Sequence, residues 1–314
     1  MFKMLMTLLI ILTEMTFAKD VVSNNLQIAD RLSKKGQYEK ALQLYENCQS
    51  GKKDETNIEK DIFTEMCLIH KARLLFKTSR FDEASEIYDG ISKTSYLWPV
   101  VLIERAWIAY KKKDYNRTLG LLATYKSPLL QSYYIPEVEV LNALAYFKLC
   151  LWDDSFSIIK DFENSEAKGQ ELKKWLKENH TKKFPLNSIT DVESIPFGRT
   201  LWLKIHRLPW IKNVDEKRKF FIKLGKFLLS EIERSSQDLF NISLELYTKK
   251  KSLIYKKERL ISDRYRGDLS HVQRKINQYF WDFQGEFFAD ELGDYSFGLK
   301  SNCETVSKGV ENEL

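Results

Sequence analysis

The chain has 314 residues and a formal net charge of +6. Its apolar content of 43% and charged content of 30% are those of a globular protein, so global disorder is excluded. It has only 12 glycines and 6 prolines, and this scarcity of turn-forming residues favours long helices over a sandwich or barrel of short strands.

The first eighteen residues (1–18) are typical of a secretory signal peptide. Lys3 and the amino terminus supply positive charge, an apolar stretch follows, and Ala18 is a small residue suited to cleavage. Glu14 interrupts the apolar stretch, and the alternative is a short membrane anchor, but the stretch is well below the roughly 20 residues that span a bilayer. No Cys follows until Cys48, which argues against a lipid anchor, so we expect a periplasmic or secreted product.

A helical-hairpin pattern then occurs four times. Each copy has an alanine on its first helix, an aromatic residue nine positions later, a small residue three positions after the aromatic, and a large apolar residue four positions further on. The alanine and the small residue allow two helices to cross closely, and the aromatic fills the hairpin turn. The alanines are Ala29, Ala72, Ala106 and Ala143, the aromatics Tyr38, Phe81, Tyr115 and Trp152, the small residues Ala41, Ala84, Thr118 and Ser155, and the large ones Tyr45, Tyr88, Leu122 and Ile159.

The spacing of these copies resembles that of tetratricopeptide repeats. The small residues of the second and third copies are 34 positions apart, which is the period of that family. The segments 36–41 (GQYEKA) and 79–84 (SRFDEA) resemble its turn, and the polar stretch 50–57 is expected to be an inserted loop. The resemblance covers residues 22–165 and implies four hairpins stacked as a solenoid, whose first helices form a concave face for a peptide or partner helix.

The four cysteines allow either disulfides or buried free thiols. In a tetratricopeptide stack the helix ends that carry Cys48 and Cys67 are neighbours, so the resemblance makes this pair the first choice for a disulfide. Cys150 and Cys303 are then the remaining pair.

The C-terminal half is predicted to be helical but less regular. Residues 166–212 form a linker or a degenerate repeat, interrupted by Gly169, Pro185, Pro196, Gly198 and Pro209. The apolar segment 201–205 within it favours a helix or a packed loop over a lone strand. Residues 213–281 form one long helix or, as the alternative, two helices with a turn near Gly267. A capping box is expected at Asn213 and Glu216. A partial heptad seam follows: Ile232, Leu239, Leu246, Leu253 and Leu260, with Ile242, then Tyr265, Val272 and Tyr279 in a shifted register.

Charge is distributed unevenly over this half. Residues 201–281 carry 19 Lys and Arg against 9 Asp and Glu, whereas residues 282–314 carry 2 against 8. The basic helix could bind an anionic envelope surface or be an ordinary solvated face. Residues 281–295, at the start of the acidic aromatic closing segment 282–300, are expected to fold back onto that helix or, as the alternative, to bind a partner protein. Residues 301–314 are expected to be a mobile tail.

No catalytic, metal-binding or cofactor-binding motif occurs in the sequence. The four histidines are scattered, and the carboxylates near Asp290 lack the spacing of a calcium loop. We therefore expect an all-α, non-enzymatic scaffold that binds a protein or peptide, is similar to exported tetratricopeptide proteins of Gram-negative envelopes, and does not bind nucleic acid. The alternatives are a docking arm of an envelope-polymer enzyme and a structural coiled-coil oligomer joined through residues 228–280.

Overall fold

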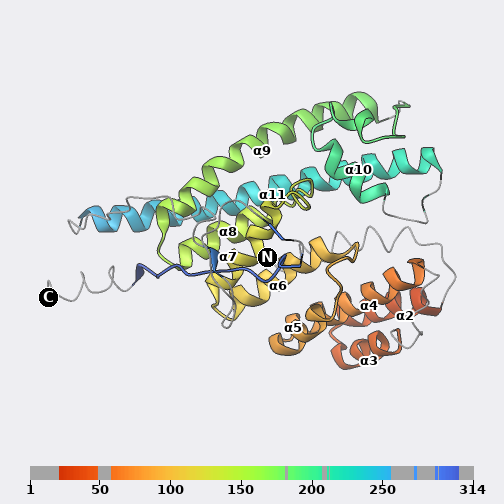
Figure 1. Cartoon of the computed structure of the whole chain (residues 1–314), viewed down its shortest axis with the longest axis horizontal. Coiled ribbons are helices and arrows are strands. Elements are labelled where there is room, and N and C mark those ends of the chain that lie inside the picture. Colours follow the sequence, from red (N-terminus) through yellow and green to blue (C-terminus); the bar gives the residue numbers. More distant parts are fainter. Residues whose placement is uncertain are drawn as a thin grey trace. The chain divides into compact units, whose positions relative to one another are not determined.

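The computed structural model describes residues 21–48, 58–180, 183–206, 211, 213–255, 272–273, 287–288 and 290–303. These ranges are predominantly helical, as the composition predicts (Figure 1). The chain divides into two compact units. Unit 1 is Met1–Ile108 with Arg207–Ile211, and unit 2 is Ala109–His206 with Lys212–Leu314. The predicted signal peptide and the predicted loop 50–57 lie outside the described residues.

Unit 1 contains helices α2 (Val21–Lys34), α3 (Tyr38–Cys48), α4 (Ile58–Lys77) and α5 (Phe81–Asp89), and most of α6 (Trp98–Lys111). Helix α2 packs on α3 and α4 packs on α5, and both α2 and α3 also contact α4. The first two predicted hairpins are therefore neighbours within this unit.

Four helix-to-helix turns along the chain have the same backbone structure. In each, the residue two positions before the aromatic has a positive φ of 57–79°, and the next amide donates a hydrogen bond to the carbonyl five residues back. The aromatic is then the first residue of the second helix, which is α3, α5, α7 (Tyr115–Ala123) or α9 (Trp152–Asn179). The positive-φ residues are Gly36, Ser79, Lys113 and Cys150.

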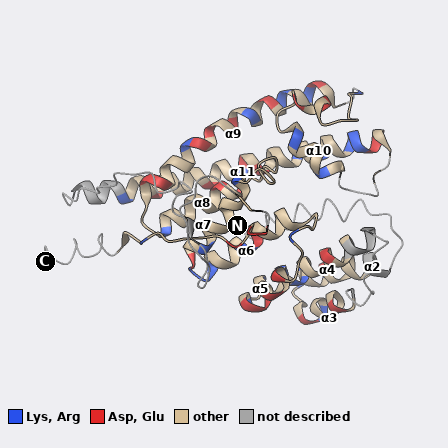
Figure 2. Ribbon diagram, in the orientation of Figure 1, with Lys and Arg blue, Asp and Glu red and all other residues tan. Residues whose placement is uncertain are grey.

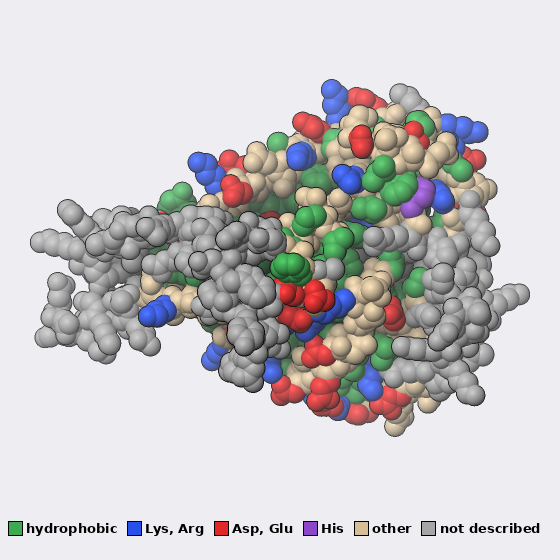
Figure 3. All heavy atoms as spheres, viewed as in Figure 1, with side chains coloured by type: hydrophobic (Ala, Val, Ile, Leu, Met, Phe, Trp, Pro, Cys, Tyr) green, Lys and Arg blue, Asp and Glu red, His purple; other side chains and the backbone are tan. Residues whose placement is uncertain are grey.

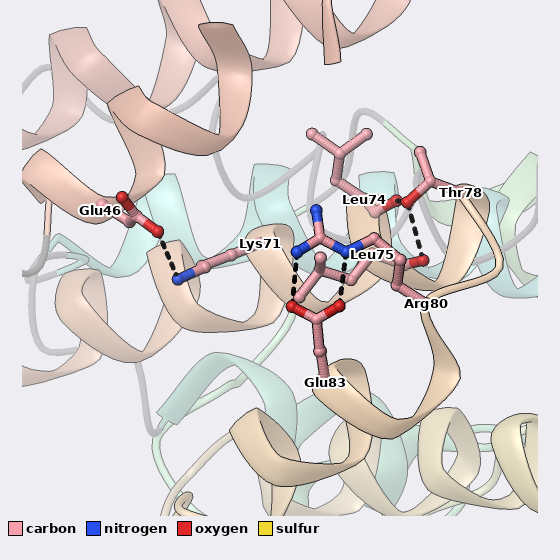
Figure 4. A network of polar contacts seen from close by, with 7 residues as sticks. All are labelled: Glu46, Lys71, Leu74, Leu75, Thr78, Arg80 and Glu83. Atoms are coloured by element: carbon pink, nitrogen blue, oxygen red, sulfur yellow. Dashed lines mark hydrogen bonds and ion pairs between the residues drawn. The ribbon is translucent and has the colours of Figure 1, made fainter. Parts of the chain in front are cut away.

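The second turn shows how this structure forms without glycine (Figure 4). The hydroxyl of Thr78 donates to the carbonyls of Leu74 and Leu75 at the end of helix α4, which also accept the backbone amides of Thr78 and Arg80. The guanidinium of Arg80 binds both carboxylate oxygens of Glu83 in the first turn of α5. Side-chain hydrogen bonds on both sides of Ser79 thus support its left-handed backbone.

Unit 2 contains α7, α8 (Glu137–Lys148), α9, α10 (Gly198–His206) and α11 (Val214–Tyr255), and short 3-10 helices at Thr124–Lys126 and Thr190–Val192. Helix α8 packs on α7 and α9, and α11 packs along α9 and also contacts α8 and α10. In Figure 1, α9 (green) and α11 (cyan) lie side by side.

The predicted boundary at residue 165 is wrong, because α9 continues to Asn179. Gly169 does not interrupt this helix. A Cβ at this position would lie 3.3 Å from a methyl carbon of Ile232 on α11, so the glycine allows the two helices to approach closely. The expected helix at 201–205 is confirmed as part of α10.

Helix α11 is a continuous helix of 42 residues, which corresponds to a length of about 63 Å. Asn213 caps its start by accepting a hydrogen bond from the amide of Asp215. In the described part of the heptad seam, Ile232, Leu239 and Leu246 are buried. Ile242 is buried as well, and Leu253 also lies in α11, although its side chain is outside the described part. Of the seam residues beyond α11 only Val272 is described, and its assignment to a helix is wrong, because it lies in a strand.

The strand pair is short and lies in the C-terminal segment. Strand β1 (Val272–Gln273) pairs antiparallel with β2 (Ser296–Phe297), so that Val272 lies opposite Phe297. β2 also contacts α7. The described residues 290–303 of the C-terminal segment therefore fold back onto α7 of unit 2, whereas the prediction for residues 281–295 named the basic helix as the destination.

Candidate functional site

The predicted repeat-packing residues are largely buried. The four early alanines are fully buried, and so are the four small residues of the second helices, namely Ala41, Ala84, Thr118 and Ser155. Of the aromatics that begin the second helices, Trp152 is buried, and Tyr38, Phe81 and Tyr115 are partly buried. The hydroxyl of Ser155 donates to the carbonyl of Ala143 over 2.9 Å, which directly joins the two small positions of the fourth hairpin.

Two polar clusters lie inside unit 1, where the sequence suggested only apolar packing. In the first cluster, Asp30 on α2 accepts hydrogen bonds from the Tyr45 hydroxyl (2.6 Å) and from Nδ1 of His70 (2.8 Å). Burial tends to raise the pKa of Asp30, but the hydrogen bonds from His70 and Tyr45 outweigh burial and lower it below its usual value. Burial and the neighbouring carboxylate raise the pKa of Tyr45, so its hydroxyl stays a donor.

The second cluster joins α4, α5 and α6. Nε of Arg73 donates to Glu104 over 2.9 Å, a second guanidinium nitrogen binds the same carboxylate oxygen, and the Tyr88 hydroxyl donates to the other oxygen. Arg73 and Glu104 are 5% and 4% exposed, so this is a buried ion pair. Burial tends to lower the pKa of Arg73, but Glu104 outweighs burial and raises it, so the guanidinium stays charged.

Both clusters depend on α4, because His70 and Arg73 lie one helical turn apart on it. His70 reaches back to α2 and Arg73 reaches forward to α6, so α4 joins three first helices of the predicted hairpins. Among the described residues, Nε2 of His70 and Nη1 of Arg73 are buried and have no hydrogen-bond partner. Sequence reasoning missed these residues, since isolated charged residues on a helix usually face solvent.

In unit 2, the C-terminal strap, which we define as residues 290–303, lies across α7. Arg117 donates to the carbonyls of Gly293 and Tyr295, each over 2.6 Å, and Asn116 both donates to and accepts from the backbone of Leu299. The end of the strap is covalently attached, because Cys303 forms a disulfide with Cys150 with a Cα–Cα distance of 5.1 Å.

This disulfide confirms the predicted pairing of Cys150 with Cys303, the two cysteines that remained once Cys48 had been assigned to Cys67. Cys67 is also disulfide-bonded, and the side chain of Cys48, its predicted partner, lies outside the described residues. The sequence did not predict the α7 residues that bind the strap. Their hydrogen bonds end on backbone atoms of the strap, which are the same for every residue type, so the sequence of the strap gives no sign of them.

Unit 2 also has a cavity of about 610 Å³ beside the start of α10. Charged residues of both signs line it, among them Lys168, Glu171 and Arg199, but its lining includes no His, Cys or Asp. Nearby, burial lowers the pKa of Lys204 on α10 to about 8, against the opposing effect of Glu231 on α11. Burial likewise raises the pKa of Glu231. A perturbed pair of this kind occurs both in structural ion pairs and in active sites.

Charges of both signs are mixed on the long helices of unit 2 (Figures 2 and 3). Helix α11 contains nine Lys and Arg but also six Asp and Glu, so most of the basic excess of residues 201–281 lies outside the described residues. Among the residues described, no group of three or more His, Cys, Asp or Glu is placed to hold a metal ion. A search of the same residues for a helix long and apolar enough to cross a membrane finds none.

Comparison of the chain with models of protein families, with curated proteins and with solved structures finds no match.

Proposed function

We propose that this chain is a non-enzymatic scaffold of the tetratricopeptide type, which is exported and holds partner proteins in a bacterial envelope. The observation that carries the proposal is the identical backbone structure of the four turns, with the same hydrogen bonds around Gly36, Ser79, Lys113 and Cys150. Repeated hairpins of this kind present surfaces to other proteins and rarely supply catalytic groups.

The sulfur chemistry supports export. Cys150 and Cys303 are paired, and Cys67 is also in a disulfide. Structural disulfides persist in oxidising compartments and are rare in the cytosol. Together with the signal-like residues 1–18, they favour the periplasm or the cell exterior.

The first helices of the hairpins are the proposed partner surface, and Ile28 on α2 is a suitable probe of it. Ile28 is a large apolar side chain that is 37% exposed on a first helix. Val214 at the start of α11 is equally exposed but lies outside the predicted repeats, so it provides a matched control.

The test is affinity capture from envelope extract with the tagged mature chain, followed by mass spectrometry. We expect wild type and the control variant Val214→Asp to capture the same set of proteins, and Ile28→Asp to lose it. Equal capture by all three proteins would contradict the assignment of the partner surface to the first helices. Thermal unfolding of each variant checks that the substitution has not unfolded unit 1.

The structural coiled-coil alternative makes a different prediction for the seam of α11. Its described residues Ile232, Leu239 and Leu246 are buried in the chain, where α11 packs along α9 and α8. A seam occupied in this way is unavailable to a second helix. Light scattering of the mature chain separates the two functions, because the alternative requires a stable oligomer under all conditions.

A further inference from the structure

The strap is bound to α7 chiefly through its main chain. Five hydrogen bonds from Asn116, Arg117 and Thr124 end on backbone atoms of the strap. They join Arg117 to the carbonyls of Gly293 and Tyr295, Asn116 to both backbone groups of Leu299, and Thr124 Oγ1 to the amide of Gly293. An amide side chain that both donates to and accepts from one residue holds an extended peptide in a fixed register.

The surface of α7 is shaped to admit a backbone at close range. A Cβ at Gly120 would lie 2.1 Å from the carbonyl oxygen of Tyr295, so only glycine permits the observed approach. Between its polar contacts the strap buries four large apolar side chains, which are 4–7% exposed: Leu292, Tyr295, Phe297 and Leu299. Helix α7 and its surroundings thus have the properties of a peptide-binding site, namely backbone-directed hydrogen bonds combined with apolar anchoring positions.

Nothing in these contacts requires that the strap and α7 belong to one polypeptide. The hydrogen-bonded residues are 169–183 positions apart in the sequence. We propose that the α7 site also accepts the strap of a second copy of this chain, so that two copies exchange straps. This proposal is independent of the partner surface proposed for the first helices.

The strap of a second chain is the appropriate occupant of the α7 site, because the site already binds this segment and every copy of the chain contains it. Binding within a chain is favoured by the local concentration of a tethered segment, which is about millimolar for a short flexible connection. Exchange between identical elements replaces each lost contact with the same contact, so its cost is low. The disulfide between Cys150 and Cys303 then fixes whichever arrangement is present when it forms.

Two full-length variants distinguish the arrangements. Cys303→Ser leaves Cys150 without its partner, and Cys150→Ser leaves Cys303 without its partner, so neither variant can form this bond within one chain. In a glutathione redox buffer, the Cys150 thiolate attacks oxidised glutathione and releases one glutathione thiolate. The Cys303 thiolate of the other chain then attacks the mixed disulfide and releases the second, so that glutathione accepts both electrons.

We expect a covalent heterodimer after the two variants are mixed at high concentration, seen on a non-reducing gel and identified by a peptide that joins positions 150 and 303. The control chain carries Cys150→Ser, Cys303→Ser and Asn241→Cys, so the thiol that replaces Cys303 lies on an exposed position of α11, outside the strap. Its yield of covalent dimer with the Cys303→Ser chain should be at least about tenfold lower, because the α7 site brings only a thiol on the strap to Cys150 at high effective concentration.

Several outcomes would overturn the proposal. One is the absence of the heterodimer in a buffer in which the reduced wild-type chain re-forms its own disulfide. Another is an equal yield for the Cys303 thiol and for the thiol of the Asn241→Cys control chain, which would indicate random collision of thiols. A third is labelling of Cys150 by a synthetic peptide of residues 290–303 without heterodimer formation, because the site would then accept a free strap but not that of a second chain.

The wild-type chain gives a second measurement that does not depend on the folding of cysteine variants. After reduction, we expect reoxidation at high protein concentration to give a dimer that is covalent on a non-reducing gel, and reoxidation at low concentration to give monomer. Monomer at every concentration would contradict strap exchange.

Discussion

The first two hairpins and the last two share one turn but are held together by different chemistry. In the first two, the residue four positions after the small one is a tyrosine, and the Tyr45 and Tyr88 hydroxyls donate to buried carboxylates. In the last two, Leu122 and Ile159 occupy that position and cannot donate. There the small residue itself carries a hydroxyl. That of Ser155 donates across the hairpin to the carbonyl of Ala143, and that of Thr118 donates to the carbonyl of Asp114 at the start of its own helix.

This difference shows that the four turns keep one backbone structure while the groups that stabilise the helices beside them differ. Unit 1 depends on ion pairs and tyrosines between helices, whereas unit 2 depends on close backbone approaches and on the strap. Substitutions should therefore have different effects in the two units, and four of them test the comparison.

The largest effect is expected from Glu104→Gln. Glu104 neutralises Arg73 where both are buried and also accepts from Tyr88. The substitution leaves a buried guanidinium without a counter-charge, which should lower the free energy of unfolding by about 4 kcal/mol. Chemical denaturation followed by circular dichroism measures this loss.

Glu83→Gln is the matched control, because it removes the charge of a carboxylate that pairs with Arg80 on the exposed surface of the same unit. We expect no measurable change in stability, since exposed ion pairs are screened by water. Equal losses for the two variants would show that burial of the Arg73–Glu104 pair has no energetic consequence.

The next largest effect concerns the strap. In Gly120→Ala the new methyl group would overlap the carbonyl of Tyr295, which is backbone and cannot rotate away. We expect a loss of about 3 kcal/mol, the upper end of the range for overpacking, and faster reduction of the Cys150–Cys303 disulfide. Thermal unfolding and timed thiol labelling measure the two effects.

Gly90→Ala controls for the change of glycine to alanine in itself. A Cβ at Gly90 would meet only carbonyl oxygens of its own helix, at 3.4 Å and beyond. Its stability should change little, and its disulfide should be reduced at the wild-type rate. A Gly120→Ala protein with wild-type stability would indicate that the strap does not lie on α7 in solution.

The positions of the four turns were predictable from sequence, and the strap site was not. Alanine, aromatic and small residues at constant offsets reflect a steric requirement that acts locally, and Ser79, Lys113 and Cys150 take the backbone of Gly36 in spite of their side chains. The bonds between α7 and the strap involve backbone atoms of the strap, which every residue except proline supplies equally. For the same reason a pattern of residue types could not identify Asn116 and Arg117 as its binding residues.

The role of Gly169 was predicted wrongly for a related reason. Gly169 was expected to interrupt a helix, because glycine has a low helix propensity. In the structure it lies in α9 opposite Ile232, where the loss of propensity is offset by the closer packing of two helices. Sequence alone does not distinguish a glycine that ends a helix from one that allows a second helix to approach.

Asp30→Asn should have an intermediate effect that depends on pH. The carboxylate of Asp30 accepts from Tyr45 and His70, and its pKa in the folded protein is lower than its usual value of 3.8. At neutral pH the substitution should lower the free energy of unfolding by about 2 kcal/mol, the value for hydrogen bonds to a charged group. Urea denaturation at a series of pH values measures this loss.

The pH dependence follows from the direction of the pKa shift. An unfolded chain binds a proton at Asp30 more readily than the folded chain, so the stabilisation is complete above pH 3.8 and is lost as pH falls through the folded pKa. The difference between wild type and Asp30→Asn should therefore shrink in acid. A difference that stays constant from pH 7 to about pH 2 would contradict the proposed role of the charged carboxylate.

The smallest effect is expected from Ser155→Ala. The Ser155 hydroxyl is fully buried and donates to the carbonyl of Ala143, and alanine fits the same crossing without this bond. The loss should be about 1 kcal/mol, the net value of a neutral hydrogen bond. Thermal unfolding of the two proteins measures it.

The reverse substitution, Ala84→Ser in the second hairpin, tests whether the two crossings are equivalent. Ala84 follows its aromatic by three positions, as Ser155 does, and Ala72 lies where Ala143 lies in the fourth hairpin. If the crossings have the same geometry, the new hydroxyl should donate to the carbonyl of Ala72. The free energy of unfolding should then change by less than about 0.5 kcal/mol, because the buried hydroxyl has a hydrogen-bond partner. A loss of about 2 kcal/mol would mean that the hydroxyl is buried without a partner, and that the hairpins share a turn but not a crossing.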